Sequence, residues 1–472
     1  MEKQMDKDIS LLVRPKVVAE LHPSFIPAVL WNRAFREAAD GDSASEPLVI
    51  ALERADGSLS CYRARVFPSG HPGFRAGLRY TERLVKSLLW MWGGYKVIVG
   101  GPAEVGEKIR QEYARRGSRR FDADLMSAAY GKKFAVEAVS AESVPAAFEK
   151  TRPLGRHLDG CRIGFDLGAS DRKVSAVVEG ETVFSEEVPW DPRNQSDPVY
   201  HYHQVMSGLH QAASHLPRVD AIGGSAAGIY IDNRAMVASL FRGIPRDLFK
   251  KKINPMFLRM QKVWKVPFEV VNDGEVTALA GSMSLNANRV LGIALGSSQA
   301  GGYVNDKGNI TGWLNELAFA PVDLDPQAPV DEWSGDAGCG VQYFSQQAVF
   351  RLAASAGIRL EENLQAVDKL RAVQDLLQRG DERAGRVFET IGVYLGYGIA
   401  YYADYYDIAH VLILGRVTSG EAGPIIQKKA TEALRSEFPE LAGRIALHLP
   451  DEQSRRVGQA VAAASLPAVT GK

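Results

Sequence analysis

Two similar segments most constrain how this chain can fold. Each consists of an apolar run, a glycine-containing turn and a second apolar run. The first spans Cys161 to Trp190, where the turn contains Asp166 and Gly168, and a later turn at Glu179-Gly180 predicts a three-stranded meander. The second spans residues 290–312, with a Gly-Ser-Ser turn about 130 residues further on. A carboxylate at a strand end beside exposed backbone N–H groups suits a Mg²⁺-bound polyphosphate, although the same residues also suit a simple tight turn. The repeat indicates two related halves that face each other across a cleft.

Three further predicted strands end where a ligand can approach the backbone closely. They lie within residues 218–233, 266–279 and 409–423, and they end near Gly228, at Asn272-Asp273 and at Gly415. A carboxylate at the tip of a strand and the start of a helix, as at Asp273, is well placed to take a proton from a hydroxyl group. Asp273 is also a candidate N-cap of that helix, because Asn and Asp are preferred there, and it can serve as cap and base at once.

The residues before Arg162 predict a separate, small α/β unit. Two alternating apolar runs flank Asp56-Gly57, which is a strong hairpin signal. A helix around Glu82–Trp92, a buried strand at 96–101 and a helix from Ala103 to Arg116 follow. A connector rich in proline, glycine and charge leads into the rest of the chain. We therefore predict three domains: an N-terminal accessory domain (1–155), a first lobe (156–285) and a second lobe (286–472).

The composition excludes several classes of protein. Lys plus Arg and Asp plus Glu both number 56, so no overall basic field is present to hold nucleic acid or an anionic membrane. Three widely spaced cysteines indicate neither a disulfide framework nor a CxxC metal pair, and the first residues lack the apolar core of a signal peptide. The most apolar stretch, Ile391 to Gly415, contains Asp404, Asp407 and His410, so it predicts a buried helix and a strand. We expect a cytoplasmic protein without a nucleic-acid or membrane partner.

Four motifs within residues 162–468, in this order along the chain, resemble the ROK family of sugar kinases and sugar-responsive repressors. FDLGASDRK at 165–173 resembles the family's first phosphate motif, and VNDGEVTALAG at 271–281 is similar to its ENDAN segment. IALGSSQAGG at 293–302 resembles the second phosphate motif, and VLILGRVTSGE at 411–421 resembles the adenosine motif, with Arg416 where a second glycine is usual. The resemblance implies an α/β, two-lobed actin-like/ribonuclease H-like ATPase fold with an additional N-terminal α/β domain.

The same resemblance implies ATP-dependent phosphorylation of a hydroxyl group on a sugar or a sugar-like polyol. By that likeness Asp273 is the general base, Asn272 and Glu316 contact the substrate, and Gly228 is placed with them. Asp166 holds Mg²⁺, directly or through water, and ATP is bound by Gly168, Ser170, Lys173, Gly296, Ser297, Ser298 and Gly415. Phosphoryl transfer depends mainly on positioning and charge neutralisation, so loops, a metal and a base suffice. The N-terminal domain is expected either to cap the cleft or to form the face of a homodimer.

The chain departs from the family pattern at the residues of a structural zinc site. The family's ExGH element reads Glu316-Leu317-Ala318-Phe319 here. Its CGCGxxGCxE element retains only Cys339, with Glu332 and Ser334 at two cysteine positions. A tetrahedral zinc needs four nitrogen or sulfur donors at close range, so we predict no zinc. Glu316 keeps the position of the sugar-hydroxyl ligand, but the altered lining puts glucose in doubt as the substrate.

Simpler interpretations stay open for several of these residues. Asp166 suits an Asx turn, Glu316 suits a structural pair, and the two serines of the second turn suit turn formation alone. His201 and His203 lie close in sequence but have no third donor nearby, so no metal is assigned to them. An aromatic run with helical spacing predicts core packing rather than a stacking platform: Tyr397, Tyr401, Tyr402, Tyr405 and Tyr406.

A rival class is a non-catalytic, ROK-like sugar or nucleotide sensor that keeps the fold without turnover. The altered substrate lining and Arg416 favour a sensor, whereas retention of Asp166 and Asp273 favours a kinase, because a sensor needs no base. The repressor branch is disfavoured, because the N-terminal residues contain no helix-turn-helix pattern and no basic recognition helix.

Overall fold

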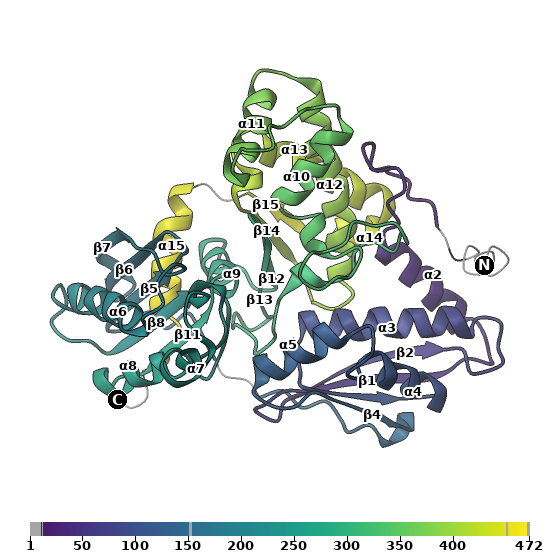
Figure 1. Cartoon of the computed structure of the whole chain (residues 1–472), viewed down its shortest axis with the longest axis horizontal. Coiled ribbons are helices and arrows are strands. Elements are labelled where there is room, and N and C mark those ends of the chain that lie inside the picture. Colours follow the sequence, from purple (N-terminus) through teal and green to yellow (C-terminus); the bar gives the residue numbers. More distant parts are fainter. Residues whose placement is uncertain (1–10, 12, 151–152, 450–451, 470–472) are drawn as a thin grey trace.

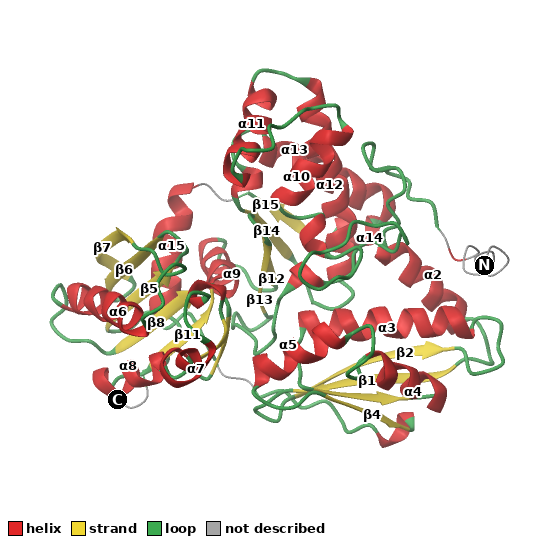
Figure 2. Cartoon of the chain, viewed as in Figure 1, coloured by secondary structure: helices red, strands yellow, loops and turns green. Residues whose placement is uncertain are grey.

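The computed structural model describes residue 11 and residues 13–150, 153–449 and 452–469, with no side chains described for 452–457. These residues form a mixed α/β architecture built around three larger sheets and one two-stranded hairpin (Figure 1, Figure 2). None of the described helices is long and apolar enough to cross a bilayer. The first ten residues, where the sequence indicated no signal peptide, lie outside the described residues.

The N-terminal sheet has the strand order β2-β1-β3-β4, and the predicted hairpin around Asp56-Gly57 is confirmed. Its strands are β1 (Glu46–Glu53), β2 (Leu59–Val66), β3 (Lys96–Gly100) and β4 (Ala135–Val139), and its helices are α3 (Phe74–Met91), α4 (Ala103–Glu112) and α5 (Arg120–Tyr130). Helix α3 begins well before the predicted Glu82, directly after its N-cap residue Gly73. The strands and helices expected for this unit are therefore present, and its separation as a domain stays a prediction.

The first-lobe sheet has the strand order β11-β8-β5-β6-β7, and the predicted meander forms its antiparallel side. Its strands are β5 (Cys161–Leu167), β6 (Asp171–Val178), β7 (Glu181–Pro189), β8 (Ala221–Ala226) and β11 (Phe268–Asn272). Around it lie α6 (Pro198–Ala213), α7 (Arg246–Leu248), α8 (Met256–Trp264) and the hairpin of β9 (Ile229–Ile231) and β10 (Arg234–Val237). Strands β8 and β11 run parallel to β5, so the carboxyl ends of all three meet at one edge.

The second-lobe sheet has the strand order β13-β12-β14-β15, with β12 and β14 parallel. Its strands are β12 (Val290–Leu295), β13 (Gln299–Val304), β14 (His410–Leu414) and β15 (Ala446–His448). Its helices are α10 (Gln346–Ser355), α11 (Ala366–Gln378), α12 (Glu382–Tyr402), α13 (Ala422–Glu437) and α14 (Pro439–Ala442). The apolar stretch from Ile391 to Gly415 is the end of α12 followed by β14, as predicted.

Two helices, α9 (Asp273–Ser284) and α15 (Glu452–Ala464), pack together between the first-lobe and second-lobe sheets (Figure 1). Helix α15 lies directly on the first-lobe sheet, because Gly164 and Gly223 have no side chain. An added Cβ would lie 2.2 Å from the Ala460 carbonyl oxygen at Gly164 and 1.7 Å from the Ala463 carbonyl oxygen at Gly223. The end of the chain thus returns to the first-lobe sheet, and the predicted division of the chain at residue 285 stays a prediction.

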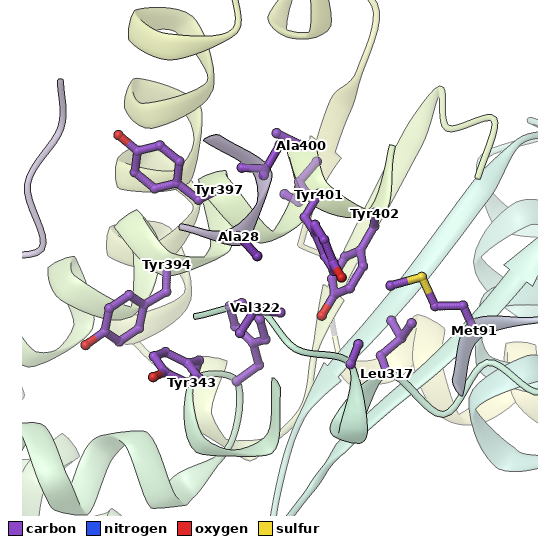
Figure 3. Packing of buried hydrophobic residues seen from close by; sticks show 14 of the residues in the cluster. Ala28, Met91, Leu317, Val322, Tyr343, Tyr394, Tyr397, Ala400, Tyr401 and Tyr402 are labelled. Carbon is purple, nitrogen blue, oxygen red and sulfur yellow. The ribbon is translucent and has the colours of Figure 1, made fainter. Parts of the chain in front are cut away.

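One hydrophobic core unites the N-terminal unit with the second lobe, whereas the first lobe has a core of its own. Figure 3 shows Met91 of α3 and Ala28 of α2 (Ala28–Asp40) among the tyrosines of α12. The predicted packing role of the aromatic run is confirmed, because all five of its rings are buried, although α12 ends at Tyr402 and the last two lie in the turn after it: Tyr397, Tyr401, Tyr402, Tyr405 and Tyr406. Burial of such rings is a large source of stability, so the N-terminal unit is an integral part of this fold.

Polar contacts strengthen the same junction. The Arg36 guanidinium lies 2.9 Å from the Asp404 carboxylate, and His22 Nδ1 lies 2.8 Å from the Tyr394 hydroxyl. The Ala28 backbone N–H donates to the Val322 carbonyl at 2.9 Å. The segment before β1 therefore runs along the second lobe.

Candidate active site

Two carboxyl groups predicted to act together lie at the same edge of the first-lobe sheet. Asp166 is the next-to-last residue of β5 and pairs in register with Ser225 of β8. Asn272 ends β11, opposite Ala226 of the same strand β8, and Asp273 begins α9. The parallel order of β5, β8 and β11 thus brings Asp166 and Asp273 to one end of the sheet.

Asp166 is held in a largely buried position. Burial raises the pKa of its carboxyl, while a hydrogen bond from Ser225 and the charge of Lys173 lower it. Lys173 is the register partner of Asp166 on β6, and its ammonium lies 3.6 Å from Asp171 and 3.9 Å from Glu187. The ammonium group of the predicted phosphate-binding lysine therefore already lies near two carboxylates.

Helix α9 is capped by Asn272 and not by Asp273, so the alternative role of Asp273 as N-cap was wrong. Asn272 Oδ1 accepts a hydrogen bond from the Gly274 N–H at 2.7 Å, and its amide donates to the Gly228 carbonyl at 2.8 Å. Both ends of this side chain are engaged with backbone. The carboxyl of Asp273, the first residue of the helix, also accepts from the Gly274 N–H, at 3.0 Å to Oδ1, which leaves Oδ2 available for chemistry.

The pKa of Asp273 is raised to about 6, first by burial and then by the negative charge of Asp166. A carboxyl group that titrates close to neutral pH is ionised often enough, and is basic enough, to accept a proton from a hydroxyl. The electrostatics therefore suit the predicted general base.

Glu316 joins the same cluster from the second lobe. Burial and the charge of Asp273 raise its pKa to about 7. Its backbone N–H donates to the Trp90 carbonyl at 2.9 Å, and the N–H of Asn315 donates to the Met91 carbonyl at 2.9 Å. These carbonyls belong to the last turn of α3, where carbonyl groups accept no hydrogen bond from within the helix. The N-terminal unit therefore holds the backbone that carries Glu316.

A fourth carboxyl group, Glu275, was not predicted from the sequence. It stands three residues after the cap Asn272 and accepts from the Asn272 N–H, which is the capping-box arrangement. Asn315 Nδ2 lies 3.4 Å from its Oε1. Burial raises the pKa of Glu275 to about 8, with Glu316 adding to the rise. Asn followed three positions later by Glu at a helix start was the sequence signal that would have found it.

Replacement of Glu275 by glutamine should remove a pH-dependent loss of stability. The folded pKa of about 8 lies above the ordinary value of 4.5, so the folded state holds this proton more tightly than the unfolded state. The wild type should therefore lose stability as the pH rises through this interval, whereas Glu275→Gln should not. From about pH 5 to about pH 9, the free energy of unfolding of the variant, measured by urea denaturation, should rise by at least about 1 kcal/mol relative to that of the wild type. Glu361→Gln, at an exposed position, should show no such gain, and a pH-independent difference for Glu275→Gln would contradict the account.

The two phosphate-loop glycines shape their turns with their own backbone groups. The Gly168 N–H donates to the Asp171 carbonyl at 3.0 Å, and the Gly296 N–H donates to the Ser298 carbonyl at 3.0 Å. Ser170, Ser297 and Ser298 are exposed. Contacts to a phosphate from these loops would therefore come from the serines more than from the glycine N–H groups.

Gly415 joins the ends of β14 and β12. Its φ is 98°, in the region that favours glycine, and an added Cβ would lie 2.2 Å from the Leu295 carbonyl oxygen. The predicted adenosine loop is thereby brought against the second phosphate loop, because Leu295 directly precedes Gly296.

Gly415→Ala should lower the free energy of unfolding by about 2 kcal/mol, because it adds a backbone clash to an unfavourable φ. Gly420→Ala is the matched control, since Gly420 has φ 62° and no atom within 4 Å of an added Cβ. That control should cost only about 1 kcal/mol. Urea denaturation distinguishes the two, and equal losses would show that the contact with Leu295 is not tight.

The oxygen donors of the site fit the predicted Mg²⁺. Mg²⁺ is usually held by one or two carboxylates together with phosphate oxygens, and Asp166 supplies one such carboxylate. Within the described ranges no group of three or more His, Cys, Asp and Glu side chains is arranged to hold a metal. The absence of zinc stays a prediction.

The positions of the expected zinc ligands are packed differently. The ring of Phe319 stacks on Trp90 at 4.1 Å between centroids, and Glu332 is exposed. Cys339 is buried, burial raises the pKa of its thiol to about 12, and its sulfur lies 3.9 Å from Ser334 Oγ. Of the positions Phe319, Glu332, Ser334 and Cys339, only Cys339 supplies a nitrogen or sulfur donor.

A buried ion network beside Cys339 was also not predicted. Lys86 of α3 is fully buried, and its ammonium lies 3.3 Å from Asp122 and 3.0 Å from Asp336. Arg119 and Arg83 reach the same Asp336 oxygen at 2.8 and 3.1 Å. The network joins α3 and α5 to the loop that carries Asp336, close to the carbonyls that hold Glu316.

No protein-family model and no curated protein matches this sequence. Solved structures do match. A ROK hexokinase from Thermus thermophilus is 20% identical with a TM-score of 0.50, over 64% of this chain and 97% of that one. A ROK family transcriptional regulator, a homolog of the E. coli MLC protein, is 20% identical with a TM-score of 0.51, over 69% of this chain and 82% of that one. A ROK family glucokinase from Streptomyces griseus, in complex with glucose and AMPPNP, is 19% identical with a TM-score of 0.47, over 64% and 99%.

At such identities the first two structures establish the fold alone. The chain has the two-lobed, actin-like ATPase fold of these ROK family structures, and the predicted α/β fold class is confirmed.

Proposed function

We propose that this chain, whose fold is that of ROK family structures, transfers the terminal phosphoryl group of ATP to a hydroxyl group of a sugar or polyol. The observation that carries the proposal is the position of Asp273: it stands at a helix start, directly after the cap residue Asn272, with a pKa raised to about 6 beside Asp166. The hexokinase from Thermus thermophilus shares this fold and supports the same reaction class.

In this mechanism the hydroxyl oxygen of the substrate bonds to the terminal phosphorus of ATP, and Asp273 accepts the proton of that hydroxyl. The bond to the bridging oxygen breaks, and ADP leaves with the electron pair. Bound Mg²⁺ would supply charge neutralisation on the phosphates, with Asp166 as its protein ligand. Glu316, with a pKa of about 7, donates a hydrogen bond to a second substrate hydroxyl when protonated and accepts one from it when ionised. Asn272 positions the site through the backbone of Gly228 and Gly274.

Nucleotide binding is tested by thermal shift with ATP and Mg²⁺, compared with ATP and a chelator. A ligand that binds only the folded state raises stability by about 2.7 kcal/mol at a concentration of one hundred times its Kd. The melting temperature of the wild type should rise only with the metal, and Asp166→Asn should abolish the rise. A metal-independent rise, or none at all, would remove ATP and Mg²⁺ from the proposal.

A non-catalytic sensor is the second candidate. It is favoured by the engagement of both ends of the Asn272 side chain with backbone, which leaves the predicted substrate contact only one amide N–H and one lone pair of Oδ1. A sensor would bind the nucleotide and a sugar without forming a phosphorylated product.

A further inference from the structure

A cavity of about 410 Å³ lies where parts of all three larger sheets meet. Its walls come from the β1–β2 turn of the N-terminal sheet, from edge strand β11 with the adjoining β9, and from the loop after edge strand β13 (Figure 1). Among its described lining residues are neither Asp166, Asp273 and Glu316 nor the two phosphate loops. Gly228, Asn272 and Glu275 do line it, so the cavity adjoins the carboxyl cluster at Glu275, and it has the size of a small-molecule site.

Four aromatic side chains form much of its apolar wall: Tyr130, Tyr230, Tyr303 and Trp313. Trp313 is stacked on Tyr303 with an interplanar angle of 11° and is packed against Trp92 at 5.2 Å between centroids. The hydroxyl of Tyr303 donates to the Asp407 carbonyl at 2.9 Å. These contacts fix two of the rings, so that part of the wall is preorganised for a ligand.

The charged residues of the lining are strongly biased towards one sign. Seven lining residues carry a carboxylate, and two, Arg54 and Lys150, carry a cation. Both cations are already engaged: Arg54 with Ser60 and Glu149, and Lys150 with the Asp56 carbonyl. Of the acidic residues, Glu149 is paired with Arg54, and Asp407 lies 3.6 Å from Arg289. An anionic ligand would therefore find no uncommitted cation among the described lining residues.

The innermost of these carboxyl groups is Glu275, which is only 9% exposed. Nearer the surface lie Asp306 and Asp407, both exposed. Burial raises the pKa of Glu275 to about 8. A positive charge in the cavity would favour the ionised form of this carboxyl, and the resulting carboxylate would stabilise the cation.

We propose that this cavity binds a small organic cation, an amine whose apolar part lies against the aromatic wall and whose ammonium group is held by the carboxylates. Aromatic faces and carboxylates together are the usual surroundings of an organic ammonium group in proteins. Because the walls come from the N-terminal unit and from both lobes, a bound amine would hold these three parts together. The proposal does not depend on phosphoryl transfer.

The test is isothermal titration of the full chain with phenethylamine and tyramine, each paired with its neutral analogue, phenethyl alcohol or tyrosol. The amines should bind at one site per chain, and the alcohols should bind at least about tenfold more weakly, because they lack the charge. Absence of amine binding, or equal binding of the alcohols, would overturn the proposal.

Two double variants with the same change in net charge locate the site. Asp306→Asn/Asp407→Asn removes two exposed carboxylates of the cavity and should weaken amine binding at least about tenfold. Asp124→Asn/Asp375→Asn removes two exposed carboxylates elsewhere and should leave binding unchanged. Equal weakening by both pairs would mean a general charge effect, and loss of binding in Asp273→Asn would place the amine in the carboxyl cluster; either result overturns the proposal.

Discussion

Lys86→Met should lower the free energy of unfolding by about 3–5 kcal/mol, which is the usual cost of removing one partner from a buried ion pair. The ammonium of Lys86 is fully buried between Asp122 and Asp336. Burial lowers the pKa of Lys86, but the Asp122 carboxylate more than offsets this and holds the pKa above its usual value. Methionine fills the space of the lysine stem but leaves the buried Asp122 carboxylate without its cation, whereas Asp336 keeps Arg83 and Arg119. Urea denaturation at neutral pH measures the loss.

Lys108→Met is the matched control for that prediction. Lys108 lies on α4 and pairs with Glu112 at 2.5 Å, but its side chain is 45% exposed. An exposed pair of this kind contributes less than about 1 kcal/mol. If Lys86→Met cost no more than Lys108→Met, the buried network would not be what holds the N-terminal unit to the loop of Asp336.

Asp273→Asn should fold normally and lose phosphoryl transfer by about a hundredfold or more, because asparagine cannot accept the hydroxyl proton. The side chain of Asn272, and not that of Asp273, caps α9, so the helix start survives the substitution. Turnover is measured with Mg²⁺ and ATP on the accepted substrate, and folding is checked by thermal denaturation. Asp191→Asn, an exposed change in the same lobe, should retain turnover. Turnover near that of wild type in Asp273→Asn would remove this residue from the mechanism.

Local patterns were enough to predict the elements that carry the site. The meander of β5, β6 and β7 follows from alternating apolar runs and from the turn at Glu179-Gly180, where both residues have positive φ. The place of Asp273 at a strand end and helix start follows from the apolar run that precedes it. Such features depend on residues that are close in sequence, so local sequence patterns are enough to predict them.

Contacts between distant residues could not be predicted in the same way. The core shared by α2, α3 and α12 joins residues that are more than three hundred positions apart, such as Ala28 and Tyr397. The return of α15 to the first-lobe sheet depends on Gly164 and Gly223, whose role appears only when the helix lies against them. No local periodicity specifies which surfaces meet.

Lys86 and Glu275 lie between these two cases. Lys86 interrupts an apolar helical run, and a lysine in such a run is rarely buried without a partner, so a buried ion pair was open to prediction. The identity of its partners, Asp122 and Asp336, was not. Glu275 had a capping signal, but its inclusion in the carboxyl cluster depends on the approach of Glu316 from the other lobe.

The most direct test of the proposed phosphoryl transfer is product analysis by mass spectrometry. The purified full chain is incubated with Mg²⁺, ATP and a panel of sugars, amino sugars and polyols, and phosphorylated product and ADP are both quantified. The account predicts that at least one compound gains a single phosphoryl group, with one ADP formed for each product and with both signals lost in Asp273→Asn. If ATP and a sugar both bind but no phosphorylated compound forms, the proposed kinase activity is contradicted and the chain is a sensor.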